Sequence, residues 1–318
     1  MKRLIIVLML LIIIIVGGIL WWKNGVSPVN SQSKKSLIFV VQKGDGVKEI
    51  SNRLKEKGLI RSRIVFFLLV RQLGLDKKIE AGDFRLNASM NTEEIAQNLT
   101  HGTLDIWITI PEGKRAAEIA EILKEKIPTY DSSWSNILTV NEGYLFPDTY
   151  LIPKDADIAM IVNQMRGNFD AKYVTLGKTN TKLSKEEIVI LASLIEREAI
   201  TDAERPIIAG ILNNRLSTGM ALQVDATIQY AKGQNLSNKK WWESVMLEEY
   251  KSVKSDYNTY LFAGLPPGPI SNPGVEALGA AVSPAQTEYL YYLHDKDKKI
   301  RYAKTLSEHN ANIEKFGL

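Results

Sequence analysis

The chain has 318 residues, of which 45% are hydrophobic and 24% charged, and its formal net charge at pH 7 is +4. This length suffices for one large or two ordinary domains, and so small a charge excess gives no reason to expect a nucleic-acid partner. The absence of cysteine excludes disulfides and thiolate metal sites, and it is compatible with export from the cytoplasm.

The first element is an uncharged apolar stretch, residues 4–22. As a helix it would be about 28 Å long, close to the thickness of bilayer hydrocarbon. We expect an uncleaved membrane anchor rather than a signal peptide, because the apolar core is long and no small-x-small site occurs before Lys23. Lys2 and Arg3 predict that residues 1–3 are a cytoplasmic tip and that the rest of the chain is exported.

A polar segment, residues 23–36, follows the anchor and contains Ser, Asn, Pro and Gln. This composition is typical of flexible linkers, so we expect a tether that lifts the first domain off the membrane. Lys23, Lys34 and Lys35 within this segment weaken the charge asymmetry on which the expected orientation rests.

A short apolar strand, a polar turn and a helix recur after the linker. The copies are Phe39–Leu54, Phe84–Leu99 and Ile108–Leu123, and the first two share the initial Phe, a Glu-Ile pair and the final Leu. Strand-turn-helix units of any origin look alike, so chance similarity is an equal alternative for the third copy. Between the first two copies lies a strongly apolar helix, Arg61–Leu73, which we assign to the core.

The first copy resembles the LysM carbohydrate-binding module, whose signature is a strand, then Lys-Gly-Asp, then a helix that begins with an apolar residue. The matching residues are Gln42, Lys43, Gly44, Asp45 and Val47. The resemblance implies a glycan-binding subdomain, to which we assign residues 37–105. Glycine at positions 44 and 46 would let the backbone adopt positive φ and approach a sugar closely.

The segment Ser184–Ala199 carries an apolar helical pattern into two carboxylates, Glu196 and Glu198. Ser184 followed three residues later by Glu187 is a capping box, so the helix should begin at Lys185. Apolar side chains occupy most of its circumference, which predicts a largely buried helix.

Within this helix, Glu198 is the candidate general acid. Leu194 and Ile195 lie one turn before it, so its carboxyl should project from the margin of the apolar face. Desolvation and the negative end of the helix dipole both disfavour the charged form. Glu196 has the small residues Ala192 and Ser193 one turn before it, so we expect an ion pair or a surface role for it. The alternative is that both glutamates belong to the solvated end of a core helix.

Downstream segments supply candidates for substrate binding. Met220–Tyr230 alternates apolar and polar residues, which predicts a strand. Asp256–Tyr260 and Gly264–Gly274 are rich in Pro, Gly and Asn and should be ordered loops, which often build clefts beside a core helix. Tyrosine rings stack on sugars, and amides bind hydroxyl and acetamido groups. The candidates are Gln223, Asp225 and Thr227 on one strand face, with Tyr257, Asn258, Tyr260 and Asn272 on the loops.

These segments together resemble the endolytic murein transglycosylases, the YceG-like family. The motifs that carry the resemblance are LASLIEREA, LQVDATIQY, DYNTY, GLPPGPISNPG and SEHN, in that order. The resemblance covers nearly everything beyond the anchor and implies that residues 106–318 form the catalytic domain. The family's catalytic acid is the second glutamate of its E-x-E, which falls on Glu198. Ala226 stands where many relatives carry Pro, a departure that concerns the local turn.

The resemblance implies cleavage of peptidoglycan without water, at the β-1,4 bond between N-acetylmuramic acid and N-acetylglucosamine within a strand. One carboxyl would protonate the leaving oxygen and then, as a base, let the muramyl O6 close a 1,6-anhydro ring. Asp225 would orient substrate or hold Gln223. This activity would terminate the elongation of nascent glycan strands, in the company of peptidoglycan synthases.

The expected fold class is α+β, with a transmembrane helix, a LysM-like subdomain and a mixed α/β catalytic domain that contains a buried catalytic helix and ordered Pro/Gly-rich loops. Metal and serine hydrolases are disfavoured, because His101, His294 and His309 lack metal-binding spacing and no G-x-S-x-G occurs. We expect no metal or other cofactor. The alternative from another functional class is a membrane-tethered glycan-binding scaffold without catalysis.

Overall fold

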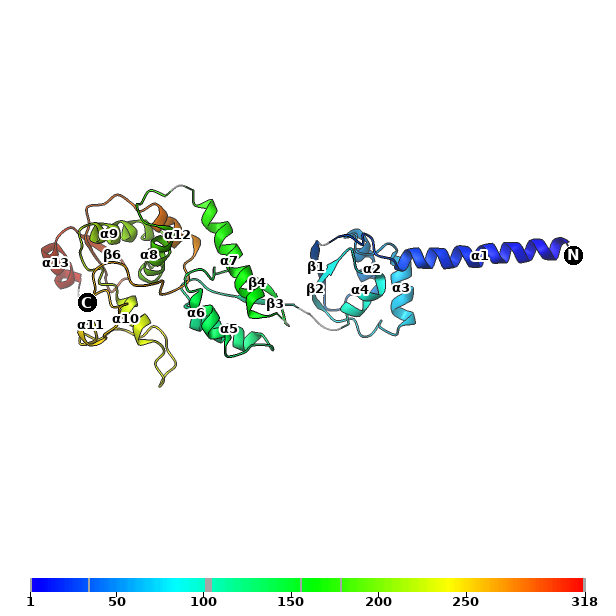
Figure 1. Ribbon diagram of the computed structural model, residues 1–318, viewed down its shortest axis with the longest axis horizontal. Coiled ribbons are helices and arrows are strands. Elements are labelled where there is room, and N and C mark those ends of the chain that lie inside the picture. Colours follow the sequence, from blue (N-terminus) through cyan, green and yellow to red (C-terminus); the bar gives the residue numbers. More distant parts are fainter. Residues whose placement is uncertain (1, 34, 101–104, 155, 178, 317–318) are drawn as a thin grey trace. The chain divides into compact units, whose positions relative to one another are not determined.

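The structure is a computed structural model that describes residues 2–33, 35–100, 105–154, 156–177 and 179–316. His101 therefore lies outside the described residues. The chain forms two compact units: unit 1 is Met1–Trp107 with Leu151–Asp155, and unit 2 is Ile108–Tyr150 with Ala156–Leu318. Helices and short antiparallel strands occur together, which confirms the expected α+β class at this level (Figure 1).

Unit 1 contains α1 (Lys2–Val26), β1 (Ser36–Val41), α2 (Val47–Glu56), α3 (Arg63–Gln72), β2 (Gly82–Asn87) and α4 (Thr92–Asn98). The paired strands β3 (Asp105–Thr109) and β4 (Thr149–Pro153) each begin in one unit and end in the other. Unit 2 contains α5 (Ala116–Lys126), α6 (Trp134–Val140), α7 (Ile158–Thr175), α8 (Lys185–Glu198), α9 (Arg205–Ser217), α10 (Asp225–Lys232), α11 (Glu249–Ser252), α12 (Val275–Val282), β5 (Tyr291–His294), β6 (Ile300–Ala303) and α13 (Leu306–Phe316).

Helix α1 has the length and composition of a membrane span over Met9–Val26, and only 6% of that window is buried. The helix continues to Val26, so the predicted tether begins inside it. Gly25 is buried because α1 approaches α3 there so closely that a Cβ on this glycine would lie 2.5 Å from a methyl of Val65. Arg61 Nε donates to the carbonyl of Pro28 at 2.8 Å. The expectation of a flexible tether is therefore wrong for residues 23–28, because they pack on unit 1.

The first two repeat copies form one sheet and one core in unit 1. Strands β1 and β2 pair antiparallel, and their initial phenylalanines, Phe39 and Phe84, lie directly opposite each other. The helical Ile and Leu of both copies join the phenylalanines in the same buried cluster. The third copy is also a strand followed by a helix, β3 and α5. The periodicity therefore predicted the local structure of each copy correctly.

Two details of this region differ from expectation. Gly44 adopts positive φ at +97°, but Gly46 precedes α2 with φ of −83°, which any residue can adopt. Helix α3 does contribute to the core, yet its Leu68 and the following Leu73 are 43% and 38% exposed. Assigning the whole apolar helix to the core was wrong, because only one of its faces packs against the rest of unit 1.

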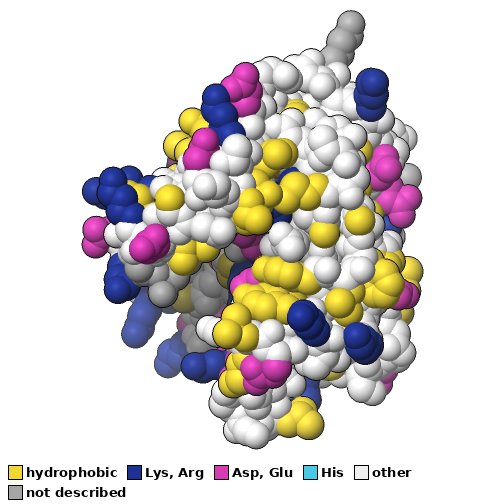
Figure 2. Space-filling view, turned by 90° about the vertical axis from the view of Figure 1, so that its left-hand side faces the viewer, with side chains coloured by type: hydrophobic (Ala, Val, Ile, Leu, Met, Phe, Trp, Pro, Cys, Tyr) yellow, Lys and Arg dark blue, Asp and Glu magenta, His cyan; other side chains and the backbone are white. Residues whose placement is uncertain are grey.

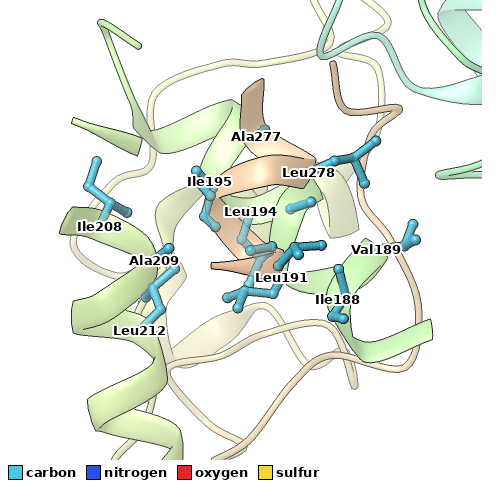
Figure 3. Packing of buried hydrophobic residues seen from close by; sticks show 14 of the residues in the cluster. Ile188, Val189, Leu191, Leu194, Ile195, Ile208, Ala209, Leu212, Ala277 and Leu278 are labelled. Carbon is cyan, nitrogen blue, oxygen red and sulfur yellow. The ribbon is translucent and has the colours of Figure 1, made fainter. Parts of the chain in front are cut away.

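Unit 2 is built around α8. The predicted capping box is present, with the Ser184 hydroxyl accepting from the backbone N–H of Glu187 and the Glu187 carboxylate accepting from that of Ser184. Its residues from Ile188 to Ile195 are all buried. Figure 3 shows Leu191 and Leu194 of α8 packing with Leu278 of α12 and with the α9 side chains. The expectation of a largely buried helix is confirmed.

The Pro/Gly-rich loop is fixed to α8 by hydrogen bonds. Ser193 accepts from the backbone N–H of Ile270 at 3.0 Å, and its carbonyl accepts from the Ser271 hydroxyl at 3.2 Å. The backbone N–H of Gly274 donates to the Glu196 carboxylate at 3.0 Å. These bonds pair polar groups that burial would otherwise leave unsatisfied, so the segment is an ordered loop as predicted.

Residues 220–230 do not form the predicted strand. Gln223 has a φ of +50°, and α10 begins at Asp225. The same alternation of apolar and polar residues fits a turn followed by a helix. In this arrangement Leu222, Val224 and Ala226 are all buried. Gln223 and Asp225 therefore do not share a strand face, and Thr227 does not extend a polar row.

Candidate active site

The C-terminal end of α8 opens on a cavity of about 620 Å³ in unit 2. Its wall is formed by α8, α9, the turn before α10, α10 itself, α11, the loop around Tyr260, strand β5 and helix α13. The lining residues are Arg197, Glu198, Arg215, Gln223, Asp225, Ala226, Gln229, Tyr250, Tyr260, Tyr291, Tyr292, Leu293, His294, Leu306 and His309. This volume falls within the range of small-molecule sites.

Glu198 lies at the last residue of α8 and lines this cavity. Burial, and secondarily the charge of Asp225, raise the pKa of Glu198. The Tyr292 hydroxyl donates to Oε2 of Glu198 at 2.7 Å, and this bond, with His294 and Arg197, opposes the rise. A carboxyl with a raised pKa in a cavity is suited to hold a proton and deliver it to a bound substrate.

Glu196 has a different environment. Its Oε1 accepts from Arg205 Nη2 at 3.0 Å, and its Oε2 accepts from the backbone N–H of Gly274. This side chain is only 6% exposed, so it is buried and ion-paired rather than solvated. Of the two roles expected for Glu196, an ion pair or a surface role, the structure shows the ion pair, and it is buried rather than at the surface.

Asp225 is the second acidic residue of the cavity wall. The Tyr260 hydroxyl donates to its Oδ1 at 2.6 Å and the Tyr250 hydroxyl to its Oδ2 at 3.3 Å. Burial and the adjacent Asp225 raise the pKa of Tyr260, which keeps this hydroxyl protonated as a donor. The two tyrosines fix the carboxylate orientation, with Gln223 next to it on the wall.

The structure brings Glu198, Gln223, Asp225 and Tyr260 together, and places the other candidates outside the lining of this cavity. Thr227 is fully buried and bonds Thr259. Asn258 is fully buried and donates to the carbonyls of Tyr250 and Val253.

Two further candidates also lie within the protein's own packing. Asn272 is fully buried, accepting from the backbone N–H of Leu145 and donating to Glu142 and to the carbonyl of Lys114. The Tyr257 ring packs against that of Tyr230, with centroids 4.8 Å apart. The described contacts of these side chains are structural.

Sequence reasoning missed several residues of the cavity wall. Tyr292 lies far from Glu198 in the chain, on a strand whose short YYLH pattern carries no signal for a partner in α8. Tyr250 lies in a segment that we did not interpret. His309, in SEHN, lines the cavity and stacks on Tyr291, and its Nδ1 has no hydrogen-bond partner among the described residues. The short distances arise from tertiary packing, which local patterns do not encode.

Cationic side chains are packed into the same wall. The Arg197 guanidinium lies over the Trp242 ring, 3.9 Å from its centroid. Arg215 donates to the carbonyls of Leu290 and Leu222 at 2.7 and 2.6 Å. On the face drawn in Figure 2, hydrophobic side chains gather near the middle, with acidic and basic side chains interspersed.

Comparisons with known proteins agree on the family. A model described as the YceG-like family matches residues 39–315. A Bacillus subtilis protein named endolytic murein transglycosylase is 32% identical over 327 residues, which cover 92% of this chain and 88% of that protein. A Streptococcus pneumoniae protein of the same name is 28% identical over 334 residues, which cover 90% of this chain and 59% of that protein.

A solved structure gives the same result. The crystal structure of a YceG-like protein from Listeria monocytogenes superimposes with a TM-score of 0.57 at 28% identity, covering 88% of this chain and 99% of that one. The family model spans most of the chain, and the similarity extends over nearly the whole length of the Bacillus protein. This chain belongs to the YceG-like family.

Proposed function

We propose that the protein is an endolytic murein transglycosylase, a lyase that cleaves inside peptidoglycan glycan strands. The observation that carries the proposal is Glu198, a carboxyl with a raised pKa on the wall of a 620 Å³ cavity, at the end of the largely buried helix α8. The names of the Bacillus and pneumococcal relatives give the substrate class.

The proposed reaction breaks the β-1,4 bond between N-acetylmuramic acid and N-acetylglucosamine. Glu198 gives its proton to the leaving oxygen as the C1–O bond breaks, and the substrate's own acetamido group stabilises C1. The carboxylate then takes the proton of the muramyl O6 hydroxyl, whose oxygen bonds to C1 and closes a 1,6-anhydro ring. Proton and electron counts balance without water or a cofactor.

The cavity wall supplies what one carboxyl needs to perform both steps. The Tyr292 hydroxyl bonds Oε2 of Glu198, which leaves Oε1 to carry the proton toward the substrate. Burial raises the pKa of Glu198, and the charge of Asp225 adds to this rise. Asp225 is fixed by Tyr260 and Tyr250 and offers an acceptor to a sugar hydroxyl. Gln223 and Tyr260 complete the proposed sugar-binding wall.

The other segments of the chain would determine where in the cell this site acts. We propose that α1 is a single-pass anchor in the cell membrane, with residues 1–3 cytoplasmic and both units on the outer side, where peptidoglycan is assembled. Residues 37–105 act as a LysM-like subdomain that holds glycan strands, and residues 106–318 form the catalytic domain. Cleavage of nascent strands beside peptidoglycan synthases would terminate their elongation.

The test is product analysis with the full chain and purified peptidoglycan strands. We expect internal cleavage products that end in 1,6-anhydro-N-acetylmuramic acid. Products with reducing muramyl ends would show a hydrolase instead. Binding without any cleavage would show the non-catalytic scaffold and contradict the proposed activity.

A further inference from the structure

The α3 surface, defined here as Arg63, Ile64, Phe67, Leu68 and Arg71, is not used by the proposed catalysis. These residues are spaced three and four apart along α3, so they share one face. Ile64 and Leu68 are 56% and 43% exposed, while the opposite face supplies buried residues to the core of unit 1. Helix α3 is therefore apolar on both sides, and one side has no covering element among the described residues.

The α3 surface is also cationic. Between Glu56 and Asp76 the chain carries Lys57, Arg61 and the two arginines of the α3 surface, and no acidic residue. The Arg71 guanidinium lies over the Phe67 ring, 5.1 Å from its centroid. Exposed apolar side chains flanked by arginines are typical of helices that lie in the headgroup layer of an anionic membrane.

A cavity of about 510 Å³ adjoins this surface. It is lined by Arg63, Ile64 and Phe67 of α3 and by Lys48, Ser51 and Asn52 of α2. Two cationic side chains, a hydroxyl and an amide are placed beside apolar side chains, which matches a phosphate group attached to acyl chains.

The end of α1 fixes the position of this surface relative to the apolar span. Gly25 packs against Val65 of α3, and its carbonyl accepts from the Thr92 hydroxyl at 3.1 Å. Arg61 bonds the chain that leaves α1. Figure 1 shows α3 lying across the end of α1, with β1 and β2 at the far end of unit 1. Unit 1 and the end of α1 are thus joined by direct packing.

The depth of α3 follows from helix geometry. The uncharged stretch, residues 4–22, measures about 28 Å as a helix, close to the ~30 Å of bilayer hydrocarbon. Trp21 and Trp22 near its end are the residue type that marks a membrane interface. Gly25 lies only about 4.5 Å beyond Trp22, within the headgroup layer, so its neighbour Val65 places α3 at that level.

We propose that the α3 surface lies in the headgroup layer of the membrane that holds α1 and binds anionic phospholipid there. The proposal rests on the proposed membrane anchor. Its consequence is that unit 1 is held at the membrane surface rather than suspended on a tether, so the LysM-like subdomain meets glycan strands where they emerge from the membrane.

The test uses the absence of cysteine, which allows one thiol to be introduced and labelled in the full chain. Leu68→Cys reports on the α3 surface. Ile14→Cys, 72% exposed on α1, reports on insertion of the anchor, and Val40→Cys, 47% exposed on β1, is the matched control at the far end of unit 1. Each labelled protein is reconstituted in vesicles of phosphatidylethanolamine and phosphatidylglycerol whose acyl chains carry a fluorescence quencher.

We expect quenching at Ile14→Cys and Leu68→Cys and none at Val40→Cys. Adding Arg63→Gln and Arg71→Gln to the Leu68→Cys protein should lower the ratio of docked to undocked α3 roughly tenfold or more, with unchanged melting, because both arginines are exposed. Vesicles of phosphatidylcholine alone should give the same loss.

The other outcomes separate this proposal from the anchor on which it rests. Quenching at Ile14→Cys with Leu68→Cys no different from Val40→Cys would overturn membrane contact by α3 and leave the anchor intact. No quenching at Ile14→Cys would overturn the anchor and this proposal with it. A Leu68→Cys label that responds to added glycan strands but not to lipid would assign the α3 surface to glycan and overturn the proposal.

Discussion

The Tyr292 hydroxyl donates a hydrogen bond to Oε2 of Glu198 across 2.7 Å, joining strand β5 to the end of helix α8. This bond stabilises the charged form of Glu198, whereas burial and Asp225 disfavour it. The proton affinity of Glu198 is therefore set by identifiable neighbours, and removing each neighbour should move it in a defined direction.

Tyr292→Phe should raise the pKa of Glu198 further, because the bond to the carboxylate is lost. In a pH–rate profile of glycan cleavage, the alkaline limb, where the acid loses its proton, should move to higher pH. We also expect turnover at the optimum to fall roughly tenfold, because the carboxyl loses the bond that orients it. An alkaline limb that stays in place would show that Tyr292 does not act on the ionisation of Glu198.

Asp225→Asn should have the opposite effect on the same limb. Removing the negative charge removes one cause of the raised pKa, so Glu198 should ionise at lower pH. Asparagine keeps an oxygen that can accept from Tyr260, so the local structure should survive. Tyr292→Phe is the control for this variant. If the alkaline limbs of the two variants moved in the same direction, the proposed electrostatics would be contradicted.

Glu142 should make the stability of unit 2 depend on pH. It is buried, with both carboxylate oxygens accepting from the backbone N–H of Ala116, and burial raises its pKa from 4.5 to about 7. At low pH both states hold the proton, and between pH 4.5 and about 7 only the folded state keeps it. The free energy of unfolding should therefore fall with rising pH, by up to about 3 kcal/mol from this residue.

Glu142→Gln removes the ionisable group and should flatten this pH dependence. The measurement is denaturant unfolding of both proteins at several pH values across that range. Parallel curves for the two proteins would mean that Glu142 ionises in the folded state as readily as in the unfolded state.

Asn272→Ala should destabilise the protein by about 3 kcal/mol, because it leaves the buried Leu145 N–H without its acceptor and removes the amide that donates to the buried Glu142 carboxyl. Asn136→Ala, at an exposed position on α6, is the matched control and should change stability by less than about 0.5 kcal/mol. Both are measured by denaturant unfolding. Cleavage per folded molecule should be retained in Asn272→Ala, and its loss at unchanged stability would assign Asn272 to substrate binding instead.

The sequence predicted α8 well because its signals are local. The Ser184–Glu187 box fixes where the helix begins, and Leu194 and Ile195 place Glu198 at the margin of a buried face. The strand predicted around Asp225 was wrong because alternation over a few residues fits a turn and a helix equally well. The choice between them depends on tertiary packing.

The contacts around the site could not be predicted from the sequence, because they too depend on tertiary packing. Asn258 and Asn272 have the amide groups that bind sugars, but the same amides satisfy buried backbone in loops, and composition does not distinguish the two uses. Tyr292 meets Glu198 only through packing of β5 against α8. Likewise, the segment expected to be a tether is held by Val65 of α3 and by Arg61, which precedes that helix.

The two glutamates of α8 provide the final prediction and its control. Glu198→Gln keeps the shape of the side chain and an oxygen that can accept from Tyr292, but it has no proton to donate to the leaving oxygen. Glu196→Gln weakens a buried ion pair with Arg205, so we expect it to lose about 3 kcal/mol of stability and to retain cleavage per folded molecule. Glu186→Gln, at an exposed position in the first turn of α8, should leave both stability and cleavage nearly unchanged.

The direct measurement is the rate at which each purified protein forms 1,6-anhydromuramyl ends from peptidoglycan strands, with thermal melting and glycan binding measured alongside. Glu198→Gln should lose at least ~10² to 10⁴-fold in rate with unchanged melting and glycan affinity, since one group serves both proton transfers. A Glu198→Gln protein that forms these ends at close to the wild-type rate would show that the reaction uses another acid.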